Sequence, residues 1–113
     1  MKQTIIVARG RRVLIADSDG GRVAWYLKRF PRALVGRTPV DALGVLSSTH
    51  IDLCILADGA EPIAKFLAMG QYGVRVLITS QDHFDIEALR RWLPKAEVAR
   101  FGEFEINIVR SNF

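Results

Sequence analysis

The sequence predicts an α/β domain in which helices cover both faces of a mostly parallel, five-stranded sheet. Short apolar runs without polar alternation, such as residues 13–16, are typical of strands that are buried on both faces. Stretches with apolar residues at helical spacing separate these runs, which is the strand–helix rhythm of a doubly wound fold. The 113 residues suffice for one domain with one core. We therefore expect a single three-layer α/β/α sandwich.

Composition limits the class of protein. Half of the residues are apolar and a quarter are charged, which is the balance of a globular protein. No apolar run approaches the ~20 residues of a membrane helix, and the apolar part of the first residues is too short for a signal peptide. The single cysteine, Cys54, has no partner for an internal disulfide. We therefore expect a cytoplasmic protein without membrane association.

The strands are expected at residues 13–16, 33–36, 52–57, 74–79 and 96–101. Right-handed crossovers and helices on both faces favour the spatial order second, first, third, fourth, fifth. This domain core spans residues 12–101, and arms at residues 1–10 and 103–113 flank it. Each arm contains a short extra strand, which we expect at a sheet edge or on a partner chain, because a central parallel strand already has two neighbours.

Four helices are expected between these strands. The first ends at Pro31, which cannot continue a helix. The second begins with Thr38 as its cap, a proline at the first helical position and a carboxylate at the third. The third spans residues 62–69. The fourth begins with Ser80 or Asp82 as its cap and ends before a proline.

Three of these strands resemble the corresponding strands of response-regulator receiver domains. The stretches that carry the resemblance are residues 13–19, 52–57 and 76–80. Residues 22–31 and 38–43 are also similar to the cyclic-phosphate-processing receiver domains, a group found often in phages and bacteria. The resemblance implies a flavodoxin-like receiver fold with its site at the carboxyl edge of the sheet.

The residues at that edge depart from the receiver pattern. Receivers accept a phosphoryl group on an aspartate at the end of the third strand, where this chain has Ala57, which has no nucleophile. The resemblance places Ser18 at the second acidic position and Arg100 at the position of the receiver lysine. We therefore expect a non-phosphorylatable pseudo-receiver without a cofactor, which acts as a protein–protein interaction or regulatory module.

Two alternative functions stay open. In the first, Asp17, Asp19 and Asp58 hold Mg²⁺, which prefers oxygen ligands, in a hydrolase of cyclic phosphates. Its candidate catalytic residues are Asp17, Asp58, Ser80 and His83. In the second, the chain binds nucleic acid through its arginine clusters. This requires the members of two clusters to share one face: Arg9, Arg11, Arg12, Lys28, Arg29 and Arg32.

Candidate contact residues for a partner are either arginines or aromatic. They are Arg11, Arg12, Arg29, Arg90, Arg91, Trp92 and Arg100. A protein partner is expected at the Trp92 helix with the fifth strand, or at the extra strands. Because exposed strand edges invite pairing, we also consider a homodimer.

Overall fold

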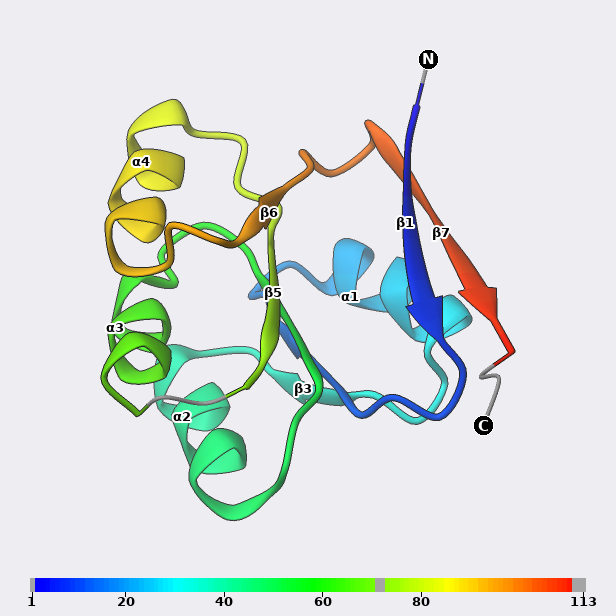
Figure 1. The fold of residues 1–113 in the computed structure, drawn as a ribbon, viewed down its shortest axis with the longest axis horizontal. Helices are drawn as coiled ribbons and strands as arrows, with labels where there is room; N and C mark the ends of the chain where they lie inside the picture. The colour runs from blue at the N-terminus through cyan, green and yellow to red at the C-terminus, as the bar shows by residue number, and fades with distance from the viewer. Residues whose placement is uncertain (1, 71–72, 111–113) are drawn as a thin grey trace.

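A parallel five-stranded sheet forms the centre of the computed structural model, which describes residues 2–70 and 73–110 (Figure 1). Its strands lie side by side in the order β3 (Leu34–Gly36), β2 (Val13–Ala16), β4 (Leu53–Leu56), β5 (Arg75–Ile78) and β6 (Glu97–Val98). Every neighbouring pair is parallel. Counted along the chain from β2, these strands are the second, first, third, fourth and fifth.

The two central strands, β2 and β4, are buried at every position. Successive side chains of a strand point to opposite faces, so Leu14 and Cys54 pack on one side while Ile15 and Ile55 pack on the other. Both faces must therefore be apolar, which explains why these runs lack alternation.

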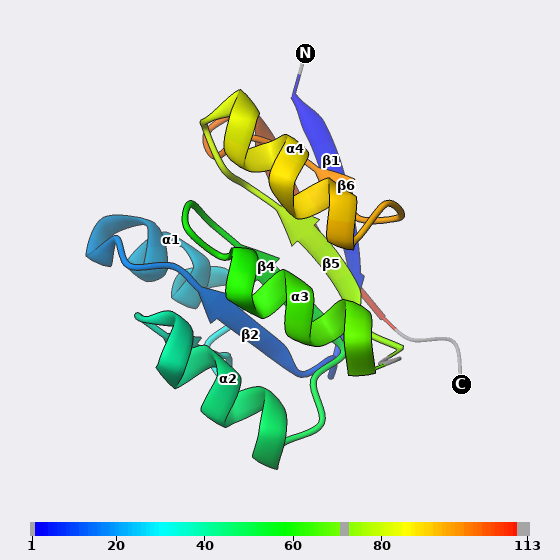
Figure 2. The ribbon, with the colours of Figure 1, turned by 90° about the vertical axis from the view of Figure 1, so that its left-hand side faces the viewer.

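Three helices cover one face of the sheet: α2 (Pro39–Ser48), α3 (Glu61–Gly70) and α4 (His83–Trp92) (Figure 2). The predicted caps are present. The Thr38 side chain accepts a hydrogen bond from the backbone of Asp41, with Pro39 at the start of α2. Asp82, rather than Ser80, caps α4. These bonds satisfy backbone donors that the first turn of a helix leaves unpaired.

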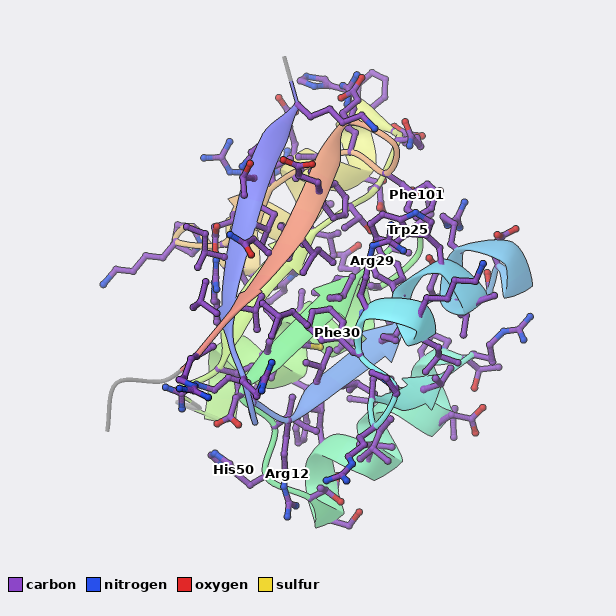
Figure 3. All side chains as sticks on the ribbon, turned by 90° about the vertical axis from the view of Figure 1, so that its right-hand side faces the viewer. Arg12, Trp25, Arg29, Phe30, His50 and Phe101 are labelled. Carbon is purple, nitrogen blue, oxygen red and sulfur yellow. The ribbon has the colours of Figure 1, made fainter. Side chains whose placement is uncertain are left out.

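The opposite face is covered by α1 (Gly20–Arg29) together with a separate two-stranded parallel ribbon (Figure 3). The ribbon pairs β1 (Gln3–Ala8) with β7 (Phe104–Val109). Its inward side chains join the core of this face, where the exposed fraction of Ile5, Val7 and Phe104 is 2% each. Aromatic side chains fill the space between α1 and the ribbon, with the Trp25 ring centroid 5.2 Å from that of Phe101.

The position of the ribbon corrects the expectation for the two arms. The extra strands neither extend the sheet nor leave the domain, because their apolar side chains bury a sheet face that has no helix after β6. Arg75 fixes this position, since its Nη1 donates to the carbonyl of Ile6 at 2.5 Å and its Nε to Glu97 at 2.6 Å. The fifth strand is also shorter than expected. Residues 1, 71–72 and 111–113 lie outside the described residues. The first residue of the first arm and the last three of the second arm are among them.

None of the helices within residues 2–70 and 73–110 combines the length and the apolar character that a membrane crossing requires.

Two glycines provide a matched test of the packing between β3 and α2. A Cβ atom on Gly36 would lie 2.6 Å from the Cα of Ala42, whereas a Cβ on Gly44, within α2, would meet nothing within 4 Å. We predict that Gly36→Ala lowers the free energy of unfolding by about 2 kcal/mol through overpacking. Gly44→Ala should raise it by about 0.5–1 kcal/mol, because alanine favours the helix. Urea unfolding of both variants measures this, and equal effects would contradict the packing described.

Candidate functional site

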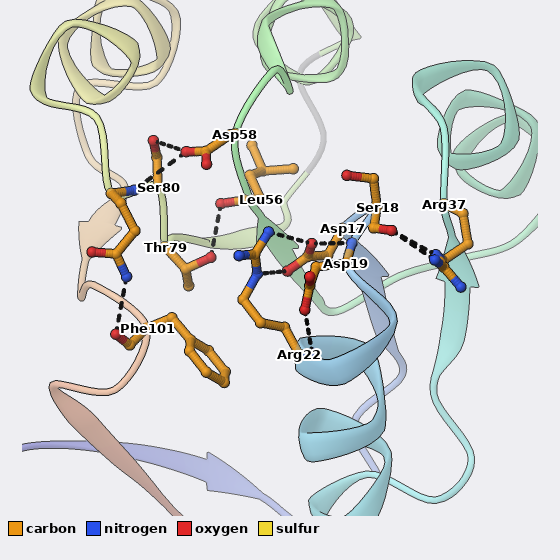
Figure 4. Close-up of polar contacts among 11 residues, drawn as sticks. Asp17, Ser18, Asp19, Arg22, Arg37, Leu56, Asp58, Thr79, Ser80 and Phe101 are labelled. Atoms are coloured by element: carbon orange, nitrogen blue, oxygen red, sulfur yellow. Dashed lines mark hydrogen bonds and ion pairs between the residues drawn. The ribbon is translucent and has the colours of Figure 1, made fainter.

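The carboxyl edge of the sheet carries the polar side chains that the sequence singled out. Asp17 follows β2, Asp58 lies two residues after β4, and Ser80 lies two residues after β5 (Figure 4). In open α/β sheets this edge is where ligands bind. The contacts of these side chains therefore show whether the carboxyl edge can hold a metal ion or carry out catalysis.

Asp17 is neutralised by an arginine of its own chain. Nε of Arg22 lies 2.8 Å from Oδ2 of Asp17, and Nη2 lies 2.9 Å from Oδ1. The backbone N–H of Asp19 also donates to Oδ1, at 2.9 Å. The side chain of Asp17 is fully buried, while 26% of the Arg22 side chain is exposed. The bond to Asp17 raises the pKa of Arg22, with smaller contributions from the charges of Asp19 and Asp58.

The local sequence explains this ion pair. Asp19 caps α1 by accepting a hydrogen bond from the backbone of Arg22 at 2.8 Å. Arg22 is the third residue of that helix, so its side chain leaves the first turn beside the end of β2. A planar guanidinium donates two parallel bonds to one carboxylate, which lysine does not match. Arg22 was not among the site residues expected from the sequence, although an arginine five positions after a strand-end aspartate was a usable signal.

Asp58 organises the loop between β5 and α4. Its Oδ1 accepts hydrogen bonds from the Ser80 hydroxyl and from the backbone of Gln81, the latter at 3.2 Å. The Gln81 side chain in turn donates to the carbonyl of Phe101 at 3.0 Å. The carboxylate of Asp58 therefore accepts from loop donors of its own chain.

Two further polar side chains, those of Thr79 and Tyr26, are buried near this edge. The hydroxyl of Thr79 donates to the carbonyl of Leu56 at 3.2 Å. Burial raises the pKa of Tyr26 to about 12, so its phenol stays neutral at physiological pH. Tyr26 was not a candidate site residue from the sequence, because helical periodicity marks a position as buried without showing what its polar atoms meet.

The predicted catalytic and metal-binding residues do not gather at one point. Within residues 2–70 and 73–110 no three ligating side chains lie close enough to hold a metal ion. Asp17 pairs with Arg22, Asp19 caps α1, and Asp58 binds the loop after β5. The imidazole of His83 instead lies exposed in the first turn of α4, 3.1 Å from Glu87.

The predicted contact residues fall into separate regions. Arg90 and Arg91 are exposed on α4, and Arg100 is exposed after β6. Trp92 lies exposed at the end of α4, with 36% of its surface accessible, and its Nε1 donates to Glu61 of α3 at 3.3 Å. The remaining three, Arg11, Arg12 and Arg29, line a groove of about 850 Å³ at the opposite, amino edge of the sheet.

Asp52 fixes the loop that brings Arg11 and Arg12 to this groove. Its Oδ2 accepts from the backbone of Arg12 at 2.8 Å, and its Oδ1 lies 3.0 Å from the imidazole of His50. The backbone bond from Arg12, followed by His50, lowers the pKa of Asp52. The carboxylate of Asp52 therefore holds the loop before β2 in place at the amino edge of the sheet.

No family model and no curated protein matches the chain. Among solved structures, it is similar to a de novo designed protein with a Rossmann 2x3 fold, determined by NMR in solution. The identity is 23% and the TM-score 0.61, over 79% of this chain and 76% of the designed one. At this identity the likeness shows the fold alone, a Rossmann-like α/β domain with a parallel sheet.

Removing Arg22 tests the ion pair at the carboxyl edge. We predict that Arg22→Gln lowers the free energy of unfolding by about 2 kcal/mol, because it leaves the buried carboxylate of Asp17 without a cation. The control Arg91→Gln, on exposed α4, should change it by less than about 0.5 kcal/mol. Adding Asp17→Asn to Arg22→Gln should recover much of the loss. Urea unfolding reports all three, and equal costs for the two single variants would refute the role of Arg22.

Proposed function

We propose that the protein is a non-phosphorylatable, receiver-like module that regulates a protein partner by binding it. The pairing of Asp17 with Arg22 carries this proposal. Both oxygens of the carboxylate accept bonds from one guanidinium, at 2.8 and 2.9 Å. An arginine of the same chain therefore supplies the positive charge that a divalent cation would supply beside such a carboxylate.

The end of β4 supports the same proposal. A phosphoryl acceptor needs a nucleophilic oxygen, and the residue that follows β4 is Ala57, with 3% of its surface exposed. The next carboxylate, Asp58, accepts bonds from Ser80 and Gln81. Both bonds end on Oδ1 of Asp58 and tie this carboxylate to the loop between β5 and α4, which supports a structural role for it.

Exposed apolar side chains at the same edge favour a protein partner. Helices α2 and α4 begin just after β3 and β5, and their first turns carry Val40 and Phe84. The exposed fraction of Val40 is 78% and that of Phe84 is 80%. Aromatic side chains such as Phe84 are enriched in the cores of protein–protein interfaces. A second copy of this chain is one such partner.

Two assays separate this proposal from an enzymatic function. With acetyl phosphate and Mg²⁺, the intact mass of the protein should stay unchanged. With cyclic phosphodiesters and Mg²⁺ or Mn²⁺, no product should form. Affinity capture from the source cells should then retain a protein that binds the wild type and is lost with Phe84→Ser, while Arg91→Gln still retains it. Turnover that disappears in Asp17→Ala, or a phosphoryl group on Asp58, would overturn the proposal.

A further inference from the structure

The groove at the amino edge joins two arginine clusters that lie about twenty residues apart in the chain. One comes from the turn between β1 and β2, and the other from the end of α1 and the loop before β3. The lining arginines are Arg9, Arg11, Arg12, Arg29 and Arg32. Lys28, which the sequence grouped with them, is not part of the lining. Figure 3 shows Arg12 below the tip of β1 and Arg29 beside α1.

Backbone bonds hold the first cluster in place and leave its side chains free to bind. The N–H of Arg9 donates to the carbonyl of Val109 at 2.7 Å, and Gly10 turns the chain with a φ of 87° that favours glycine. The carbonyl of Arg12 accepts from Asp52 at 2.8 Å. The loop is therefore anchored through its backbone at both ends.

These charges have few counterions of their own. Among the described residues, no carboxylate forms a salt bridge with Arg9, Arg11, Arg12 or Arg32. Asp52 is near enough for its charge to interact with Arg11, but its oxygens already accept from Arg12 and His50. Like charges crowded on one surface repel each other, and a bound anion relieves that repulsion.

Arg29 belongs to the lining of the groove, but its guanidinium lies back along α1 against Trp25, which is not part of the lining. Its guanidinium carbon lies 3.5 Å from the centroid of the Trp25 ring, and its Nη1 donates to the Trp25 carbonyl at 3.0 Å. Stacking on an aromatic ring leaves the remaining N–H groups of a guanidinium available to an oxyanion.

The rest of the lining contains no polar side chain. Besides the arginines it consists of glycine and apolar residues, among them Val13, Leu34 and Ile108. Such walls offer no hydrogen bonds with which to read a base or a sugar. They do strengthen the attraction between the arginines and an anion, because low-dielectric walls focus the field.

We propose that this groove binds the sugar–phosphate backbone of a single nucleic acid strand without reading its sequence. Four arginines without a salt bridge, Arg9, Arg11, Arg12 and Arg32, with Arg29 beside them, exceed what one phosphate can engage, so they suit several phosphates in a row. The groove lies at the edge of the sheet opposite to the one that carries the proposed function. Each proposal can therefore fail without the other.

Fluorescence anisotropy with labelled twelve-nucleotide oligothymidylate and oligouridylate tests the proposal. With about four phosphates engaged, affinity should fall roughly 50-fold between 50 and 200 mM salt. Arg9→Gln combined with Arg32→Gln should weaken binding at least tenfold and reduce the salt dependence. The matched control, Arg90→Gln combined with Arg91→Gln, removes the same charge from α4 and should bind within twofold of the wild type.

Folding of each variant is checked through the single thiol. Cys54 is fully buried, and burial raises its pKa to about 12, so it should resist thiol reagents until the domain unfolds. Equal loss of binding in both double variants would show that net charge alone is responsible, and would overturn the proposal. So would a groove variant that binds like the wild type, or polyglutamate that competes as well as the oligonucleotides.

Discussion

The architecture depends on how the carboxylate at the end of the central strand is neutralised. Asp17 lies in the interior, and an unpaired charge there would cost several kcal/mol. Arg22, in the first turn of the following helix, neutralises this carboxylate, so the same bonds that neutralise the charge also join α1 to the end of β2. At the edge where many α/β domains bind a ligand, the carboxylate of Asp17 thus contributes to the packing of α1 on the sheet.

The second unusual feature is the ribbon of β1 and β7, which takes the place of a helix. The first and last strands of the described chain pair along their whole length, so the two ends of the domain are joined on one sheet face. This arrangement brings the turn after β1 to the end of α1, where the arginine groove lies. The arginine groove therefore depends on the pairing of β1 with β7, whereas the Asp17–Arg22 pair depends on the connection from β2 to α1.

Much of this fold could be predicted from the sequence, because its rules are local. Unbroken apolar runs located the central strands, and Thr38 with Pro39 located the start of α2. The partner of Asp17 could not be found in this way, since periodicity scores apolar positions and treats Arg22 as solvated. The pairing of β1 with β7 could not be predicted for a different reason. Ile5 and Ile106 are neighbours only because the first and last strands pair, and local patterns do not show this. The arginine clusters were visible in the sequence, but their meeting in one groove depends on that same pairing.

We propose that Arg22 supplies the positive charge that the buried carboxylate of Asp17 requires, in place of a metal ion. Titration with paramagnetic Mn²⁺, followed by amide NMR signals, tests it most directly. The account predicts that the signals of Asp17, Asp19 and Arg22 keep their widths at millimolar Mn²⁺ in the wild type. Selective broadening of these signals in the wild-type protein, at concentrations that leave the rest of the domain unchanged, would contradict it.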